Sequence, residues 1–134
     1  MFRPTLISAI FIGLFATQSA AKPPLKDVER IREDMITIGM ADTIRTNCAT
    51  ISARMIKAYF FLQSAKSHAQ SLGYTKVEID AYVSNDAEKA RLLGIAYGRL
   101  AELGVATDQP ETYCTAGLAQ IASGTAVGNL LKAK

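Results

Sequence analysis

Residues 48–72 read CATISARMIKAYFFLQSAKSHAQSL, and the prediction of the fold starts from this stretch. Its apolar residues recur at steps of three and four, which is the period of one face of an α-helix. They are Ile51, Met55, Ala58, Tyr59, Leu62, Ala65, Ala69 and Leu72. Ile56, Phe60 and Phe61 add a second apolar strip, and a helix that is apolar on more than one side needs partners on more than one side. We therefore expect residues 48–72 to form the long central helix of a small bundle.

Further helices are predicted on both sides of this segment. Before it, Asp27 can cap a first helix with an apolar stripe that ends near Ile44. After it, three pairs of residues resemble helix-capping boxes, namely Thr75 with Glu78, Asn85 with Glu88, and Asp108 with Glu111. No segment alternates apolar and polar residues over a useful length, so no strand is predicted. The expected fold is all-α, with five or six helices.

The first 21 residues have the features of a secretory signal peptide. Arg3 precedes an apolar run over residues 6–16, and small residues lead to a cleavage point after Ala21. The run is shorter than the roughly 20 apolar residues that span a membrane. Cleavage leaves an extended leader over residues 22–26, which contains two prolines, and a single helical domain over residues 27–134 in the periplasm. A retained signal anchor is the alternative.

The two cysteines, Cys48 and Cys114, are expected to form a disulfide. Exported proteins keep paired cysteines oxidised, and a bond here would close a loop worth roughly 4 kcal/mol in the chain-entropy model. The alternative is a redox or metal pair. That alternative is disfavoured because the sequence has no Cys-x-x-Cys motif and a single histidine, His68.

Composition and motifs argue against several classes of site. The net charge is +3, and no basic block with interleaved aromatic residues suggests nucleic-acid binding. The chain lacks a haem attachment sequence, a glycine-rich phosphate loop and zinc-ligand spacing, so we expect no metal and no cofactor. His68 near the end of a helix is explained by the helix dipole, and no catalytic residue is predicted.

Arg45, Asn47 and Arg54 crowd the turn around Cys48 and form a candidate binding corner. Arg54 lies at the border of the apolar stripe, where a guanidinium needs a carboxylate partner. The favoured interpretation is a structural ion pair, with Asp42, Asp86 or Glu88 as the partner. The alternative is a corner that binds an anion or a protein beside the disulfide.

Some apolar residues lie off the main stripes of their helices. They are Ile56, Phe60, Leu92 and Ile95. A small bundle cannot cover all of them, and those left exposed would form a surface for a partner.

Several short runs resemble a known family. They are ADTIRTNC at 41–48, ISAR at 51–54, GY at 73–74, EI at 78–79, AYV at 81–83 and EKAR at 88–91. The family that they resemble is a group of small exported alphaproteobacterial proteins with no assigned activity. Its genes lie near those for respiratory complex I, so the resemblance implies an accessory role.

The function expected from these observations is non-enzymatic binding of another protein in the periplasm. Two alternatives stay open. One is an inhibitor or immunity-type protein against a periplasmic or cell-wall enzyme, which a projecting basic corner would favour. The other is a small hydrolase, which would need a cleft that contains His68 or a pair of carboxylates. The sequence does not fix the oligomeric state.

Overall fold

The computed structural model describes residues 21–134, so the predicted signal peptide lies outside the described residues except for Ala21. The described chain contains a 3-10 turn η1 (Leu25–Asp27), helices α1 (Glu29–Asn47), α2 (Met55–Ser71), α3 (Lys76–Ser84), α4 (Asp86–Glu102), α5 (Pro110–Ser123) and α6 (Ala126–Asn129), and strands β1 (Ile51–Ala53) and β2 (Leu131–Ala133). The all-α class is confirmed, and so is the Cys48–Cys114 disulfide.

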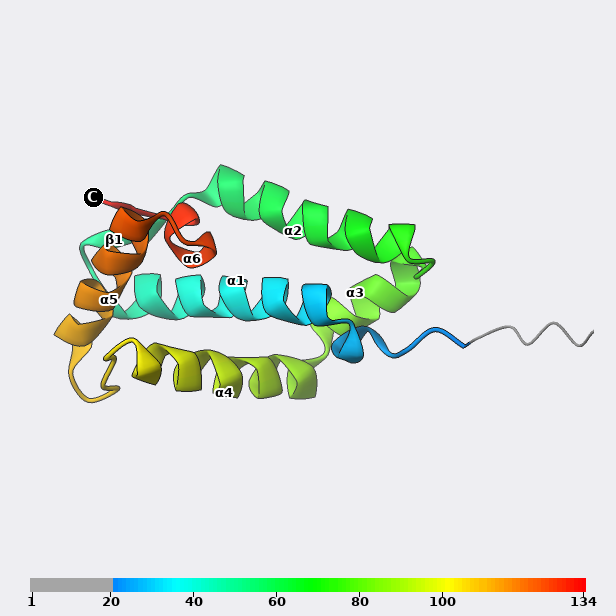
Figure 1. Ribbon diagram of the computed structural model, residues 1–134, viewed down its shortest axis with the longest axis horizontal. Coiled ribbons are helices and arrows are strands. Elements are labelled where there is room, and N and C mark those ends of the chain that lie inside the picture. The colour runs from blue at the N-terminus through cyan, green and yellow to red at the C-terminus, as the bar shows by residue number, and fades with distance from the viewer. Residues whose placement is uncertain (1–20) are drawn as a thin grey trace, which may run out of the picture.

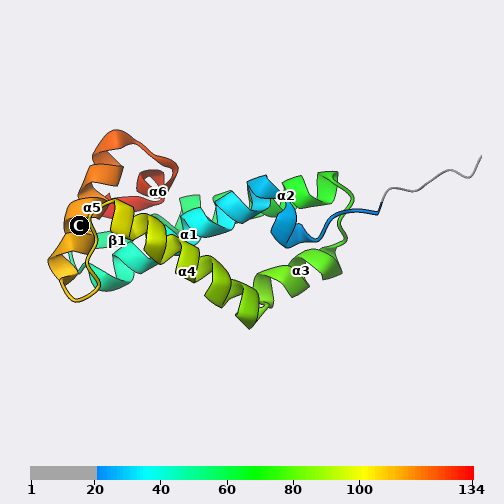
Figure 2. The same ribbon diagram turned by 60° about the horizontal axis from the view of Figure 1, so that its bottom comes forward.

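The central helix is α1. Figure 1 shows α1 running through the middle of the molecule, with α2 along one side and α4 along the other. Helices α5 and α6 and the β-ribbon gather at one end of α1, and α3 lies at the other end (Figures 1 and 2). The prediction that residues 48–72 form the central helix is therefore wrong, because among residues 21–134 α2 packs along α1 and otherwise meets α3 near its end.

Residues 48–54 leave the helical conformation and form a turn and a strand. Cys48 has an extended backbone, and the Ile51 N–H donates to the Cys48 carbonyl at 3.3 Å. Residues 51–53 then pair antiparallel with residues 131–133, with Ile51 opposite Ala133. The prediction of no strand is corrected by this ribbon. Ile51 is buried as its apolar character requires, but from a strand rather than from a helix.

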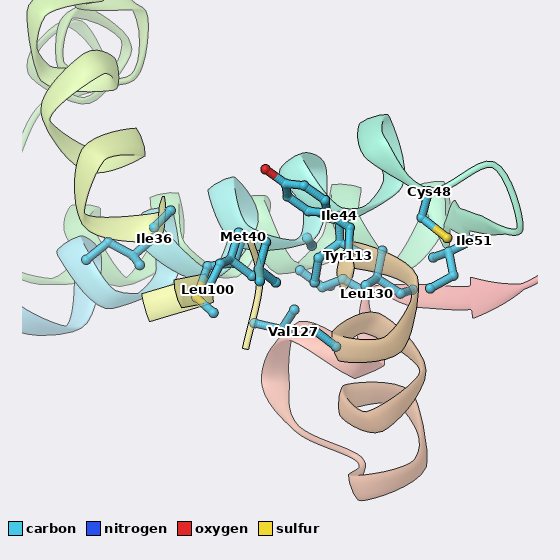
Figure 3. Packing of buried hydrophobic residues seen from close by; sticks show 14 of the residues in the cluster. Ile36, Met40, Ile44, Cys48, Ile51, Leu100, Tyr113, Val127 and Leu130 are labelled. Carbon is cyan, nitrogen blue, oxygen red and sulfur yellow. The ribbon is translucent and has the colours of Figure 1, made fainter. Parts of the chain in front are cut away.

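The main core lies between α1, α4, α5 and α6. Ile36, Met40 and Ile44 of α1 pack with Leu100 of α4 and with residues of the C-terminal segment (Figure 3). A second, smaller cluster lies at the other end of α1 and contains Leu25, Ile31, Ala69, Tyr74 and Ile79. Together the two clusters bury α1 along its length, whereas α2 contributes mainly alanines and half-buried residues.

The capping predictions have mixed outcomes. Thr75 and Glu78 form the full box, with Thr75 N–H donating to Glu78 Oε2 at 2.6 Å and Glu78 N–H to Thr75 Oγ1 at 3.2 Å. Asn85 accepts from the Glu88 N–H at 2.8 Å, but the Glu88 carboxylate bonds elsewhere.

Two capping predictions are wrong. Asp27 lies in the 3-10 turn, and α1 begins at Glu29 without a side-chain cap. Asp108 does not cap α5 either, because the loop before Pro110 is held by the Thr112 hydroxyl, which accepts from the Ala106 N–H at 2.9 Å.

Gly128 marks the closest backbone approach, between α6 and the end of α5. A Cβ at position 128 would overlap the Gln120 carbonyl and lie 2.7 Å from the Ile121 nitrogen. These are backbone atoms, which cannot rotate away as a side chain can. We expect Gly128→Ala to lower the free energy of unfolding by about 3 kcal/mol, measured by urea denaturation.

Gly94→Ala is the matched control for this substitution. A Cβ at position 94 of α4 would meet nothing within 4 Å. Alanine is the better helix former, so this variant should gain about 0.5–1 kcal/mol. If Gly128→Ala and Gly94→Ala shifted the urea midpoint alike, the close approach of α6 to α5 would be contradicted.

Candidate functional site

The structure places the three residues of the predicted corner near one end of α1 and gives each a different role. Arg45 donates through Nε to Asp42 Oδ1 at 2.8 Å, and both side chains are exposed on α1. The Asn47 side-chain amide donates to the Thr43 carbonyl at 2.8 Å and thus binds the last turn of its own helix. The Arg54 side chain is exposed and forms no ion pair within residues 21–134.

The ion pairs expected for Arg54 are therefore not formed, because each candidate partner has another cation. Asp42 pairs with Arg45, Asp86 with Lys89, and Glu88 with Arg91. The backbone of Arg54 is fixed nonetheless, since its N–H donates to the Leu130 carbonyl at 2.8 Å. The Arg54 side chain, whose guanidinium is unpaired within residues 21–134, therefore projects from a fixed backbone position between β1 and α2.

Four large apolar side chains lie exposed on the first half of α2, and we call them the α2 face. They are Met55, Ile56, Tyr59 and Phe60, which are 69%, 76%, 58% and 64% exposed. The rings of Tyr59 and Phe60 lie edge to face, with centroids 5.5 Å apart.

The sequence predicted that four residues off the main stripes would lie exposed, and this prediction is correct for two of them. The exposure predicted for Ile56 and Phe60 is confirmed. Leu92 is instead buried in the main core, and Ile95 is half-buried against it. Leu92 and Ile95 were expected to be uncovered because they lie off the stripe of α4. The buried face of α4 is instead rotated relative to that stripe, since Leu92 and Ala96 are buried while Leu93 and Tyr97 of the stripe are exposed.

Two hollows adjoin the α2 face. One, of about 170 Å³, lies between α1 and the start of α2 and has Arg45 and Asp42 at its edge, with Ile38, Ala41, Ala58 and Leu130 as apolar lining. The other, of about 480 Å³, follows the first turn of α2 and includes Arg54, Lys57 and Lys132. Ala53 and Met55 line both hollows, so the two are continuous with the α2 face.

The charges around the α2 face are almost all of one sign. Residues 43–77 and residues 112–134 contain no aspartate or glutamate, and these two ranges supply both strands, α2 and α6. Every carboxylate side chain of the protein therefore comes from residues 27–42 or 78–111. Arg54, Lys57 and Lys132 border the α2 face, and Asp42 is the one carboxylate at its edge.

A larger groove, of about 750 Å³, lies between the leader and helices α3 and α4. The Tyr82 hydroxyl donates to Glu88 Oε1 at 3.2 Å, and Arg91 donates to both oxygens of the same carboxylate, at 2.9 and 2.6 Å. The Arg91 guanidinium holds the pKa of Glu88 below its ordinary value. These polar groups bind one another, and the Tyr82–Glu88 hydrogen bond joins α3 to α4.

The same groove holds the leader in place. Lys22 donates to the Gly73 carbonyl at 2.7 Å and to Glu78 at 3.2 Å, and its ammonium lies 4.8 Å from the centre of the Tyr74 ring. The Tyr74 hydroxyl donates to the Pro23 carbonyl, and Leu25 is buried in the second cluster. Sequence reasoning did not assign these roles to Lys22 and Tyr74, because their contacts join residues about 50 positions apart.

Tyr82 provides a pH-dependent prediction. Burial, followed by the charge of Glu88, raises the pKa of Tyr82 from 10.0 to about 12. The folded state thus favours the neutral phenol, and this stabilisation is present below pH 10 and is lost as the pH rises through about 12. In an ultraviolet titration of tyrosinate, Tyr82→Phe should remove one transition near pH 12. A lost transition near pH 10 would contradict the burial.

Within residues 21–134, the His68 imidazole forms no hydrogen bond or ion pair with a carboxylate. His68 lies in the last turn of α2, and its imidazole makes no hydrogen bond within the described chain. Among residues 21–134, no three His, Cys, Asp or Glu side chains are placed to hold a metal ion. None of the described helices is long and apolar enough to cross a membrane.

Comparison with known proteins identifies a family to which no activity has been assigned. The chain matches no curated protein and no solved structure. The family described as Family of unknown function (DUF5333) matches residues 23–132, which include every helix of the described chain and nearly all of both its strands. The chain therefore belongs to the DUF5333 family of unknown function.

Proposed function

We propose that this protein is a non-enzymatic, exported accessory protein that binds another protein through the α2 face. The observation that carries the proposal is the exposure of Met55, Ile56, Tyr59 and Phe60 on one face of one helix. Methionine and aromatic residues are enriched where proteins meet, and grouped exposure of this kind costs solubility unless a partner covers it.

The α2 face is also held rigidly, which favours binding. Arg54 is fixed to Leu130 immediately before α2, and the β-ribbon and the disulfide brace the same end of the molecule. A surface that is already ordered loses less conformational entropy when a partner docks. The disulfide and the N-terminal sequence support export to the periplasm, where cysteines are oxidised.

A second copy of the chain is a poor occupant of this surface. Two α2 faces packed together would bring the Arg54, Lys57 and Lys132 side chains of both copies to the same interface. Like charges across an interface repel one another and cost binding energy. The partner is therefore a different protein.

An inhibitor of an exported enzyme is the second candidate function. The exposed and unpaired Arg54 beside the α2 face is the observation that favours it. An inhibitor would use the same surface, and a loss of the partner's activity on binding would distinguish it from an accessory protein.

Photo-cross-linking tests the proposal. Benzoylphenylalanine is placed at position 60 in cells that produce the protein, and the cross-linked species is identified by mass spectrometry. Position 77 is the matched control, because Val77 is 78% exposed but is not grouped with other exposed large apolar residues of α3. Helix α3 lies near the C-terminal end of α2, away from the α2 face (Figure 1). We expect a protein adduct from position 60 and none from position 77.

A double substitution checks that the adduct depends on the apolar surface. Ile56→Asp with the cross-linker at position 60 should abolish the adduct. The substitution should leave the urea midpoint nearly unchanged, since Ile56 is exposed and contributes little to the core. If no protein adduct formed at position 60, or if positions 60 and 77 gave the same adducts, protein binding by the α2 face would be ruled out.

A further inference from the structure

We infer that the partner presents an acidic segment with an apolar anchor residue, and that the anchor enters the hollow between α1 and α2 while the carboxylates meet Arg54, Lys57 and Lys132. This inference rests on the proposed function and adds the chemistry of the partner. It is carried by the charge around the α2 face and by the shape of the adjoining hollow.

The charge argument comes from cations that have no partner within the molecule. Within residues 21–134, Arg54, Lys57 and Lys132 form no ion pair, and neither do Lys26 and Lys134. Lys66, Lys76, Lys89, Arg91 and Arg99 all pair with carboxylates. Arg54, Lys57 and Lys132 line a single hollow beside the α2 face. A surface with this arrangement attracts a partner of negative charge and repels one of positive charge.

The shape argument comes from the hollow of about 170 Å³ between α1 and α2. Its lining is apolar apart from Asp42 and Arg45, which pair with each other at its edge. A hollow of this size accepts one apolar side chain, and a few residues that fill well-packed, desolvated pockets carry most of the energy in protein interfaces. Met55 lines the hollow and belongs to the α2 face, so one segment can contact both.

A protein segment fits these features better than a lipid surface does. An anionic bilayer would also meet the cations and the protruding side chains of the α2 face. It would not insert a side chain between α1 and α2, and the recessed hollow would stay unused. The observations therefore favour an acidic, apolar protein segment.

The first experiment uses synthetic peptides as probes of the exported chain with its disulfide intact. One peptide is a helix with a leucine face bordered by glutamate, and the other has lysine in place of each glutamate. Amide chemical shifts of the isotope-labelled protein are followed during titration. We expect the glutamate peptide to shift residues 53–60 and 130–132 selectively, and the lysine peptide to bind at least tenfold more weakly. Equal binding of both peptides, or binding of neither, would overturn the inference.

Charge reversal identifies the residues responsible. Arg54→Glu, Lys57→Glu and Lys132→Glu are combined in one variant, and Lys26→Glu, Lys76→Glu and Lys89→Glu form the control with the same change in net charge. The first variant should bind the glutamate peptide about tenfold more weakly, since three exposed charge contacts contribute modestly each. The control should bind as the wild type does. An equal loss in both variants would mean that net charge alone drives the binding.

Filling the hollow tests the anchor separately. Ala58→Leu places a larger apolar side chain in the lining without changing any charge. The variant should bind the glutamate peptide about tenfold more weakly. Its urea midpoint is measured in parallel to show that it is folded. Unchanged binding by a folded Ala58→Leu variant would overturn the role of the hollow.

The photo-cross-link at position 60 separates failure of this inference from failure of the proposed function. A protein adduct that the triple charge reversal abolishes supports the inference. A protein adduct that survives the triple reversal overturns the acidic partner but leaves protein binding intact. A lipid adduct, or selective binding of the protein to phosphatidylglycerol vesicles without binding of the glutamate peptide, overturns both.

Discussion

Replacing Cys48 and Cys114 together by alanine should lower the free energy of unfolding by about 4 kcal/mol. The disulfide joins the end of α1 to the first half of α5, across a sequence separation of 66 residues. In the chain-entropy model, removal of the bond frees the unfolded chain from a closed loop of this length and so stabilises the unfolded state. Few other single features of a domain of this size contribute so much to stability.

Urea denaturation followed by circular dichroism measures this loss. The wild-type protein under a reducing agent is the matched comparison, because reduction opens the same loop without changing any other side chain. The reduced protein and the double alanine variant should unfold at similar midpoints, both well below that of the oxidised protein. Equal midpoints for oxidised and reduced wild type would show that the bond does not stabilise the fold.

Ile44→Ala should lower the free energy of unfolding by about 2–5 kcal/mol, because α1 is the helix on which the core is built. Ile44 is completely buried, and it packs so closely on α5 that a Cβ at Gly117 would lie 2.7 Å from Ile44 Cγ2. Removing this side chain leaves a cavity that the backbone of α5 cannot easily fill.

Leu62→Ala is the informative comparison for Ile44→Ala. Leu62 is half-buried on α2, beside Ile31 and Met35. Its truncation should cost about 1 kcal/mol, since less apolar surface returns to water and the space stays open to solvent. If thermal and urea denaturation gave Leu62→Ala the larger loss, α2 rather than α1 would be the energetic centre of the fold.

The sequence predicted the class of fold and the covalent bond well. Helical spacing of apolar residues marked α3, α4 and α5, and the Thr75–Glu78 box fixed the start of α3. Local features of this kind depend on neighbours in sequence, so they can be read without knowledge of the tertiary structure. The two cysteines allow one intramolecular pairing, which is the one that forms.

The identity of the central helix was harder to predict, because α1 is buried despite its polar residues. Asp34 and Thr43 are both buried in α1. Asp34 accepts from Arg30 at 3.0 Å, and the Thr43 hydroxyl donates to the Gly39 carbonyl at 2.7 Å. Their hydrogen bonds within α1 satisfy them, and α1 therefore tolerates burial between α2 and α4. The more apolar sequence of α2 suggested a central position, but much of that apolar surface faces outward.

The β-ribbon and the candidate site share a reason for having been missed in part. Residues 51–53 form a strand because residues 131–133 pair with them. A local sequence pattern does not predict a pairing between segments so far apart in the chain. The same pairing brings Lys132 beside Arg54 and Lys57. Arg45 and Arg54 could be proposed from sequence because they flank Cys48, whereas Lys132 joins them through the fold alone.

The long-range closure of this end of the molecule has a consequence for biogenesis. Cys48 cannot form its disulfide until Cys114 has been synthesised, and β1 cannot pair until β2 has been synthesised. In a partly synthesised chain, α1 is therefore exposed, because the helices that later cover it are still missing. Such intermediates are substrates for chaperones and proteases. The fold should therefore be completed late and in one concerted step, once α5 and β2 are available, rather than helix by helix.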